Sequence, residues 1–191
     1  MSSSPNSKQK IIDTALELFA RHGYDGTSIK MIARTAGVSQ GLMYNYFASK
    51  SDLLRAIFQQ GLADIDASFA QAATATTPLE QLRQHICASF EIIRQNRKFW
   101  KLYHGLRLQA AVLEQLGEDV DEAAQHISDR LQSYFVALDS PDPETDARLL
   151  FALIDGIAQH YILSPESYPL EAVLTKVINK FVPKEEDFNY A

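Results

Sequence analysis

Residues 27–53, TSIKMIARTAGVSQGLMYNYFASKSDL, form the stretch that decides the fold. Its first apolar residues recur three and four positions apart, which predicts a short amphipathic helix that Thr27 caps and Gly37 ends. These apolar residues are Ile29, Ile32, Ala33 and Ala36. Ser39 is placed to cap a second short helix over residues 40–46. Two short helices joined by a Gly-Val-Ser turn are typical of a helix-turn-helix.

The flanking segments extend this motif into an amino-terminal domain. Apolar spacing predicts one helix over residues 8–22, stopped by Gly23, and another from about Lys50 to about Ala67. We therefore expect a helix-turn-helix domain over residues 1–50, with a disordered serine-rich start at 1–7, and a sensing and dimerisation domain over 51–191.

The rest of the chain shows the same helical spacing and no strand signal, so the predicted fold is all-α. Helices are expected near 79–95, 97–116, 119–138, 143–163 and 169–182. No segment approaches the roughly 18 apolar residues of a membrane span, and the start lacks the apolar run of a signal peptide. The sequence thus predicts a cytoplasmic protein without a membrane partner.

Charge divides unevenly along the chain. Residues 1–61 hold seven Lys and Arg against four Asp and Glu, a balance of +3, and the total of −6 leaves −9 for the remainder. Binding to phosphates needs a local excess of basic side chains, which only the amino-terminal part offers. A basic head on an acidic body indicates a protein that docks one end on DNA.

The helix at 40–46 presents a surface suited to a major groove. A helical wheel places Met43 and the following Phe47 on the buried side, with small, aromatic and hydrogen-bonding residues opposite. This outward set comprises Gly41, Leu42 and Asn45, flanked by Tyr44 and Tyr46. None of these side chains is acidic, so none repels phosphate. Tyr44 is equally compatible with DNA contact and packing, and Lys30 and Arg34 with phosphate contact or a solvated face.

Residues 8–58, and the quoted stretch above all, resemble the signature of the tetracycline-repressor (TetR) family of regulators. The resemblance implies a homodimer whose body binds a small molecule and releases a palindromic double-stranded DNA operator. The matching phosphate contacts would be Thr27, Tyr46 and Lys50. The matching recognition-helix residues would be Ser39, Gln40, Gly41, Leu42, Tyr44 and Asn45. Leu42 departs from the small or hydroxylated residue usual in the family, and we expect it to touch a thymine methyl.

The segment at 147–163, ARLLFALIDGIAQHYIL, predicts the dimer interface. It carries two apolar stripes, and a helix with two apolar faces needs two burial partners. One stripe is Leu150, Ile154, Ile157 and Tyr161, and the other is Leu149, Leu153, Gly156 and His160. The last helix would add Leu174, Ile178 and Phe181 to an isologous four-helix interface. The alternative is a wholly intramolecular core.

The body offers candidate ligand contacts and no catalytic pattern. Aromatic and apolar residues that could wall a pocket are Ile86, Phe90, Trp100, Tyr103, His104 and Phe135, although ordinary helix packing is the alternative. The five histidines and the single Cys87 show neither metal-ligand nor nucleophile spacing, so no metal, cofactor or enzymatic activity is predicted. A ligand-responsive repressor is the main hypothesis. An activator, and an enzyme or carrier with an incidental helix-turn-helix, stay open.

Overall fold

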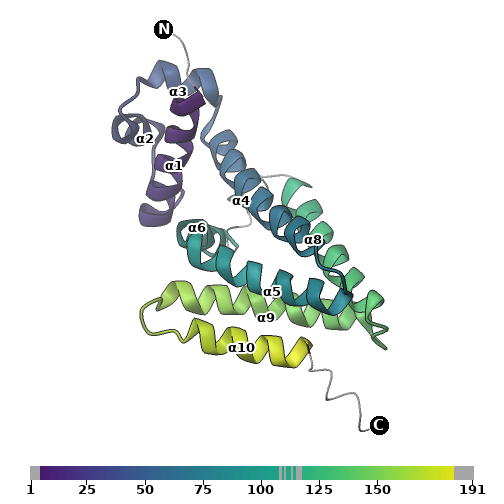
Figure 1. Cartoon of the computed structure of the whole chain (residues 1–191). Coiled ribbons are helices and arrows are strands. Elements are labelled where there is room, and N and C mark those ends of the chain that lie inside the picture. The colour runs from purple at the N-terminus through teal and green to yellow at the C-terminus, as the bar shows by residue number, and fades with distance from the viewer. Residues whose placement is uncertain (1–4, 108, 110, 113, 115–117, 183–191) are drawn as a thin grey trace. The chain divides into compact units, whose positions relative to one another are not determined.

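The structure is a computed structural model that describes residues 5–107, 109, 111–112, 114 and 118–182 (Figure 1). The residues it describes form helices and no strand, which confirms the predicted fold class. In chain order the helices are α1 (Pro5–His22), α2 (Ile29–Ala36), α3 (Gln40–Tyr46), α4 (Lys50–Ala72), α5 (Pro78–Gln95), α6 (Arg97–Leu106), α8 (Glu118–Ala137), α9 (Pro143–Leu163) and α10 (Leu170–Phe181).

The turn between α2 and α3 is built as the sequence predicts, apart from one cap. Gly37 ends α2 with φ +67°, a left-handed conformation that costs glycine little. The Ser39 hydroxyl accepts the amide of Leu42, so Ser39 caps α3. The expected cap at Thr27 is wrong. Helix α2 begins one residue later than a Thr27 cap requires, so Ser28 is its cap and accepts the amide of Met31.

Helix α1 begins earlier than expected. Residues 5–7 belong to the helix, which contradicts the prediction of disorder there, whereas residues 1–4 lie outside the described part of the chain. Pro5 at the first helical position explains the start, because proline's missing amide would have no partner in the first turn of a helix. Helix α4 also runs past its expected end, to Ala72.

The described residues form two compact units, and α4 contributes to both. The first unit holds the chain up to Leu62 together with the segment from Asn96 to Asp121, and the second holds 63–95 and 122 onward. The boundary expected after residue 50 coincides with the start of α4, whereas the two compact units divide within α4, after Leu62. Sequence spacing gave no sign that α6 packs with the amino-terminal helices.

The first unit has one apolar core that includes α6. Phe99 of α6 lies against Gly61 of α4 so closely that a Cβ on Gly61 would stand 2.3 Å from the ring. Glycine at this position is what allows the close approach of α4 and α6. The Phe99 ring also meets Phe58 edge-on, with 5.7 Å between the ring centroids. The fully buried side chains of this core include Phe19, Ile11, Ile32, Met43, Leu53, Leu54, Ile57 and Leu106.

The second unit packs α5 against α9 and α10, whose axes run nearly parallel in Figure 1. Side chains of α4, α5 and α8 meet in a buried aromatic cluster around His85. In the described part of the chain, no helix is both long and apolar enough to cross a lipid bilayer.

Candidate nucleic-acid interface and effector site

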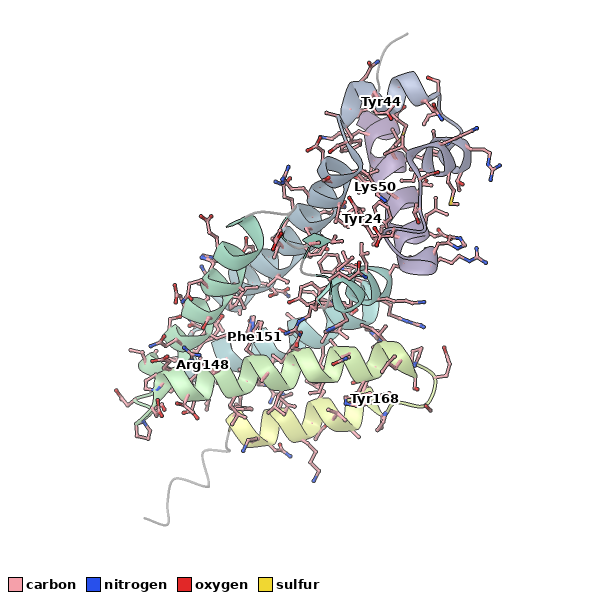
Figure 2. All side chains as sticks on the ribbon, turned by 180° about the vertical axis from the view of Figure 1, so that it is seen from behind. Tyr24, Tyr44, Lys50, Arg148, Phe151 and Tyr168 are labelled. Carbon is pink, nitrogen blue, oxygen red and sulfur yellow. The ribbon has the colours of Figure 1, made fainter. Side chains whose placement is uncertain are left out.

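Helix α3 exposes the face that the sequence predicts for DNA. Met43 and Phe47 are buried, whereas Tyr44 is 56% exposed and projects from the unit (Figure 2). The remaining outward residues are the exposed Gln40, Gly41 and Asn45 and the half-buried Leu42. A Cβ on Gly41 would meet only the Ser39 hydroxyl, at 4.0 Å. The exposed face therefore combines amides, an open glycine and one apolar side chain, without an acidic group.

Two of the residues matched to phosphate contacts are largely turned into the protein. Thr27 is only 1% exposed, and its hydroxyl donates to the carbonyl oxygens of Gly23 at 2.9 Å and Leu18 at 3.2 Å. Tyr46 is half-buried and packs against the core of the first unit. The Thr27 amide donates to the carbonyl oxygen of Tyr24, and its own carbonyl oxygen accepts from Lys50. A phosphate near Thr27 would therefore meet the amides that follow it, in the first turn of α2, which favour an anion.

Lys50, the first residue of α4, closes the loop between α1 and α2. Its ammonium donates to the carbonyl oxygens of Tyr24 at 3.0 Å and Thr27 at 3.2 Å. It also lies 4.0 Å from the centroid of the Tyr24 ring, which is a cation–π contact. A lysine has three N–H donors, so one stays available for a phosphate. Sequence reasoning assigned Lys50 to phosphate and missed this contact with the loop.

The six residues expected to wall a pocket divide between the two units. Trp100, Tyr103 and His104 lie on α6 in the first unit, where their rings pack together with Phe99. Ile86, Phe90 and Phe135 lie in the second unit and are buried. The α6 residues belong to the first unit because α6 packs against the amino-terminal α1. Trp100 is the single tryptophan of the chain and a natural fluorescent reporter.

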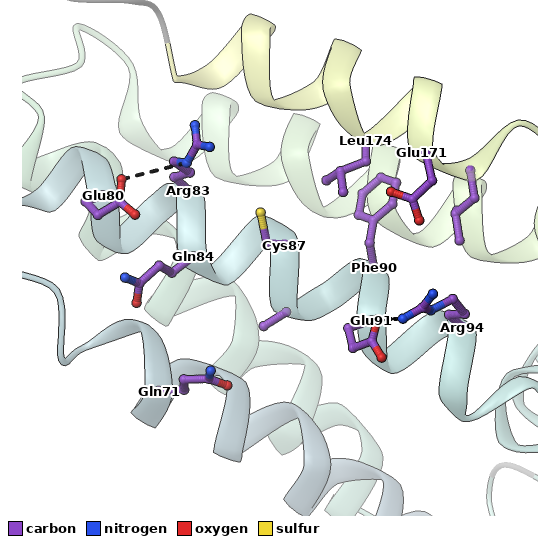
Figure 3. A pocket seen from close by; sticks show the side chains of 12 residues that line it. Gln71, Glu80, Arg83, Gln84, Cys87, Phe90, Glu91, Arg94, Glu171 and Leu174 are labelled. Carbon is purple, nitrogen blue, oxygen red and sulfur yellow. Dashed lines mark hydrogen bonds and ion pairs between the residues drawn. The ribbon is translucent and has the colours of Figure 1, made fainter.

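A groove of about 500 Å³ opens between α5 and α10 (Figure 3). Its floor includes Cys87, Phe90 and Leu174. Both arginines at its edge have carboxylate partners on the same helix, since Arg83 pairs with Glu80 at 3.8 Å and Arg94 with Glu91. Because these guanidinium groups are already paired, the groove does not present a ready anion site.

The buried cluster around His85 joins three helices of the second unit. Its imidazole stacks on Phe69 of α4 at 4.1 Å between centroids and lies 5.7 Å from the ring of Tyr134 on α8. The Arg130 guanidinium stands over the Phe69 ring at 5.0 Å. Burial and, secondarily, the charge of Arg130 lower the pKa of His85 to about 4. The imidazole is therefore neutral at pH 7.

Sequence reasoning did not select His85, although a signal was available. His85 follows the apolar Leu82 by three positions on α5, and this helical spacing already favoured the buried face for the histidine. Among the described residues, no group of three His, Cys, Asp or Glu side chains is arranged to hold a metal ion.

Helix α9 buries one of its two apolar stripes and leaves the other open. Leu150 is fully buried, whereas Leu149 is 42% exposed and His160 is exposed. Leu153 and Gly156 are half-buried, and a Cβ on Gly156 would meet nothing within 4 Å.

The predicted interface residues on α10 are partly used within the chain. Phe181 is buried and meets Phe135 edge-on at 6.0 Å, so it offers little surface to a partner. Phe135 also borders a smaller cavity of about 280 Å³. Leu174 and Ile178 are half-buried.

A helix-turn-helix with an acid-free exposed face, joined to a helical body, defines a DNA-binding regulator. Residues 11–57 match the model of the bacterial regulatory proteins of the tetR family, and residues 78–183 match that of the BetI-type transcriptional repressor C-terminal domain. The chain therefore belongs to the TetR family. It is a ligand-responsive DNA-binding repressor, and the families it matches are regulators, not enzymes.

Individual regulators are similar to this chain in sequence or in fold over nearly its whole length. The probable acrEF/envCD operon repressor of Escherichia coli K12 is 23% identical over 94% of this chain and 88% of its own. The fatty acid degradation regulator FadR of Bacillus halodurans has a similar fold, with a TM-score of 0.81 at 22% identity, over 97% of this chain and 98% of FadR. FadR of Bacillus subtilis, solved with stearoyl-CoA, gives 0.76 at 22% identity, over 92% and 97%.

Proposed function

We propose that a fatty acyl-CoA releases this repressor from a palindromic operator. One structure with a similar fold is a fatty acid degradation regulator, and another, the transcriptional regulator FadR of Bacillus subtilis, was solved with stearoyl-CoA. The DNA-binding half of the proposal depends on one observation, the exposed and acid-free face of α3. We also propose that the protein works in the cytoplasm, where its operator lies.

The proposed DNA contacts fall into two groups. Gln40 and Asn45 have amides suited to adenine, Leu42 suits a thymine methyl, and Gly41 lets the backbone approach the duplex. Tyr44 stands beside them on the exposed face. Phosphates would be met by the start of α2, which follows Thr27 and Ser28, and by the start of α3 after Ser39, together with Tyr46 and the free N–H of Lys50.

The proposed dimer interface is the open stripe of α9, extended by α10. Leu149, Leu153, Gly156 and His160 share one face of α9, on which Leu149 and His160 are exposed and Leu153 and Gly156 are half-buried. Leu174 and Ile178 would contribute their exposed parts, and Phe181 would support the interface from within. An isologous pairing of two such helix pairs would hold the helix-turn-helix domains of the two protomers in a fixed arrangement.

The experiment measures operator binding by fluorescence anisotropy on DNA from upstream of the protein's own gene. We expect stearoyl-CoA to release the DNA in a saturable manner, and free CoA and stearate to act much more weakly. A ligand that releases DNA must bind the free form more tightly, and a hundredfold preference corresponds to about 2.7 kcal/mol. Binding that stays unchanged at saturating stearoyl-CoA, and across shorter acyl chains, would exclude acyl-CoA as the effector.

A further inference from the structure

One ring nitrogen of His85 is buried in the core and has no hydrogen-bond partner among the described residues. The residue is 3% exposed, and its Nδ1 is buried with no hydrogen-bond partner in the described part of the chain. Buried polar atoms are almost always paired, because an unpaired one loses its hydration without compensation. A phenylalanine at this position would stack on Phe69 and leave no such atom. Packing alone therefore does not account for the imidazole.

The neighbouring serine determines which ring nitrogen carries the proton. The Ser89 hydroxyl donates to the carbonyl oxygen of His85 at 2.9 Å, and the Ser89 hydroxyl oxygen itself lies 3.4 Å from Nε2 of His85. Because its own proton is engaged, the Ser89 oxygen can only accept from Nε2–H. The remaining nitrogen, Nδ1, then presents a lone pair. The partner that it lacks is a hydrogen-bond donor.

The surroundings limit the chemistry of that partner. The rings of Phe69 and Tyr134 offer apolar contact, and Arg130 over the Phe69 ring meets no carboxylate among the described residues. A cation is disfavoured beside Arg130, whereas an anion is favoured. The cluster therefore suits an amphipathic anion that carries a neutral N–H or O–H donor next to an apolar body. The amides and hydroxyl of the pantetheine arm in an acyl-CoA fit this description.

We infer that Nδ1 of His85 accepts a hydrogen bond from such a donor on the effector, which makes His85 the polar anchor of the effector site. This inference rests on the proposed function. Nδ1 has almost no accessible surface, so the donor reaches it only when α4, α5 and α8 separate locally. Phe69, which covers the imidazole, belongs to α4, the helix that begins at Lys50. Binding at His85 thus displaces a helix shared with the DNA-binding unit.

Three variants test the anchor. His85→Phe removes both nitrogens and keeps the aromatic stack, His85→Asn keeps an acceptor near the position of Nδ1, and His85→Gln keeps a polar group near Nε2 only. His126→Gln, on an exposed histidine of α8, is the control. Each variant is measured for thermal unfolding, operator affinity, and stearoyl-CoA binding by Trp100 fluorescence and by operator release.

We expect His85→Phe to bind the operator as the parent does and to unfold at the same or a higher temperature. Its half-effective concentration of stearoyl-CoA should rise about tenfold or more, the loss expected for one buried hydrogen bond. His85→Asn should respond better than His85→Gln, and His126→Gln should match the parent. If His85→Phe does not fold, the comparison of the Asn and Gln variants decides whether Nδ1 of His85 anchors the effector.

The outcomes separate the anchor from the proposed function. A parent protein that ignores stearoyl-CoA would refute the acyl-CoA effector, whatever the variants do. A parent that responds, together with a folded His85→Phe variant of equal sensitivity or with Asn and Gln variants of equal sensitivity, would show that His85 is a structural histidine and overturn the inference.

Discussion

At the scale of single residues, Lys50 holds the loop between α1 and α2, a contact that sequence reasoning missed, and it is also proposed to meet a DNA phosphate. Its ammonium bridges the carbonyl oxygens of Tyr24 and Thr27, and its third N–H is the donor proposed for a DNA phosphate. The loop it closes leads directly into α2, so its geometry sets where the helix-turn-helix begins. A change at Lys50 should therefore alter both DNA affinity and the order of the loop.

Replacing Lys50 by methionine keeps the apolar stem and removes the charge. We expect weaker binding to all DNA sequences, with a salt dependence reduced by about one phosphate contact, because one counterion fewer is released. Amide hydrogen exchange at residues 23–28 should also accelerate. The control is Lys30→Met on the exposed face of α2, which should leave the loop unchanged. Unchanged loop exchange in Lys50→Met would mean that the bridging contact does not hold the loop.

The burial and the conformation of single residues were predictable where apolar periodicity or turn chemistry determined them. The burial of Met43 and Phe47 and the left-handed Gly37 followed from spacing and from the need of a tight turn. The choice between Thr27 and Ser28 as cap was not predictable, because both side chains can accept an amide and the helix start varies by one residue. The hydrogen bonding of His85 depends on Ser89, and its lowered pKa depends on burial and on the charge of Arg130, neither of which periodicity can show.

At the scale of elements, the sequence predicts the bounds of the helices more accurately than which helices pack against one another. Helix α9 has the expected bounds of 143–163, because Asp142 caps it and Pro143 begins it. The packing of α6 against α4 depends on Gly61, which sequence spacing does not single out. This contact helps to place the aromatic residues of α6 in the first unit.

The open stripe of α9 yields a prediction about assembly. Leu153→Glu should break the dimer and leave the fold intact, because the residue is half-buried in one chain and would place a carboxylate in the interface, at a cost of several kcal/mol. The matched control is Val136→Glu on α8, where the parent side chain is 57% exposed. Sedimentation measures mass and circular dichroism measures fold. A folded Leu153→Glu dimer would contradict the assignment, and a monomeric Val136→Glu would move the interface to α8.

At the scale of the whole molecule, charge and architecture agree. The +3 balance lies in the residues that build the helix-turn-helix, and the −9 balance lies in the remainder, which carries the proposed effector and dimer surfaces. DNA phosphates attract the first part and repel the second, so the charge favours DNA binding by the amino-terminal part. Two such chains paired through α9 would present two recognition helices to one duplex.

The most direct test of this account is the selection of bound sequences from random DNA by the intact protein, with Leu42→Thr in parallel. We expect an inverted repeat whose half-sites lie about one helical turn, or a small multiple of it, apart. Leu42→Thr should change the base preference at one position in each half-site, because Leu42 is proposed to touch a thymine methyl. Failure to enrich any inverted repeat would contradict the claim that a dimer of this chain reads a palindromic operator through α3.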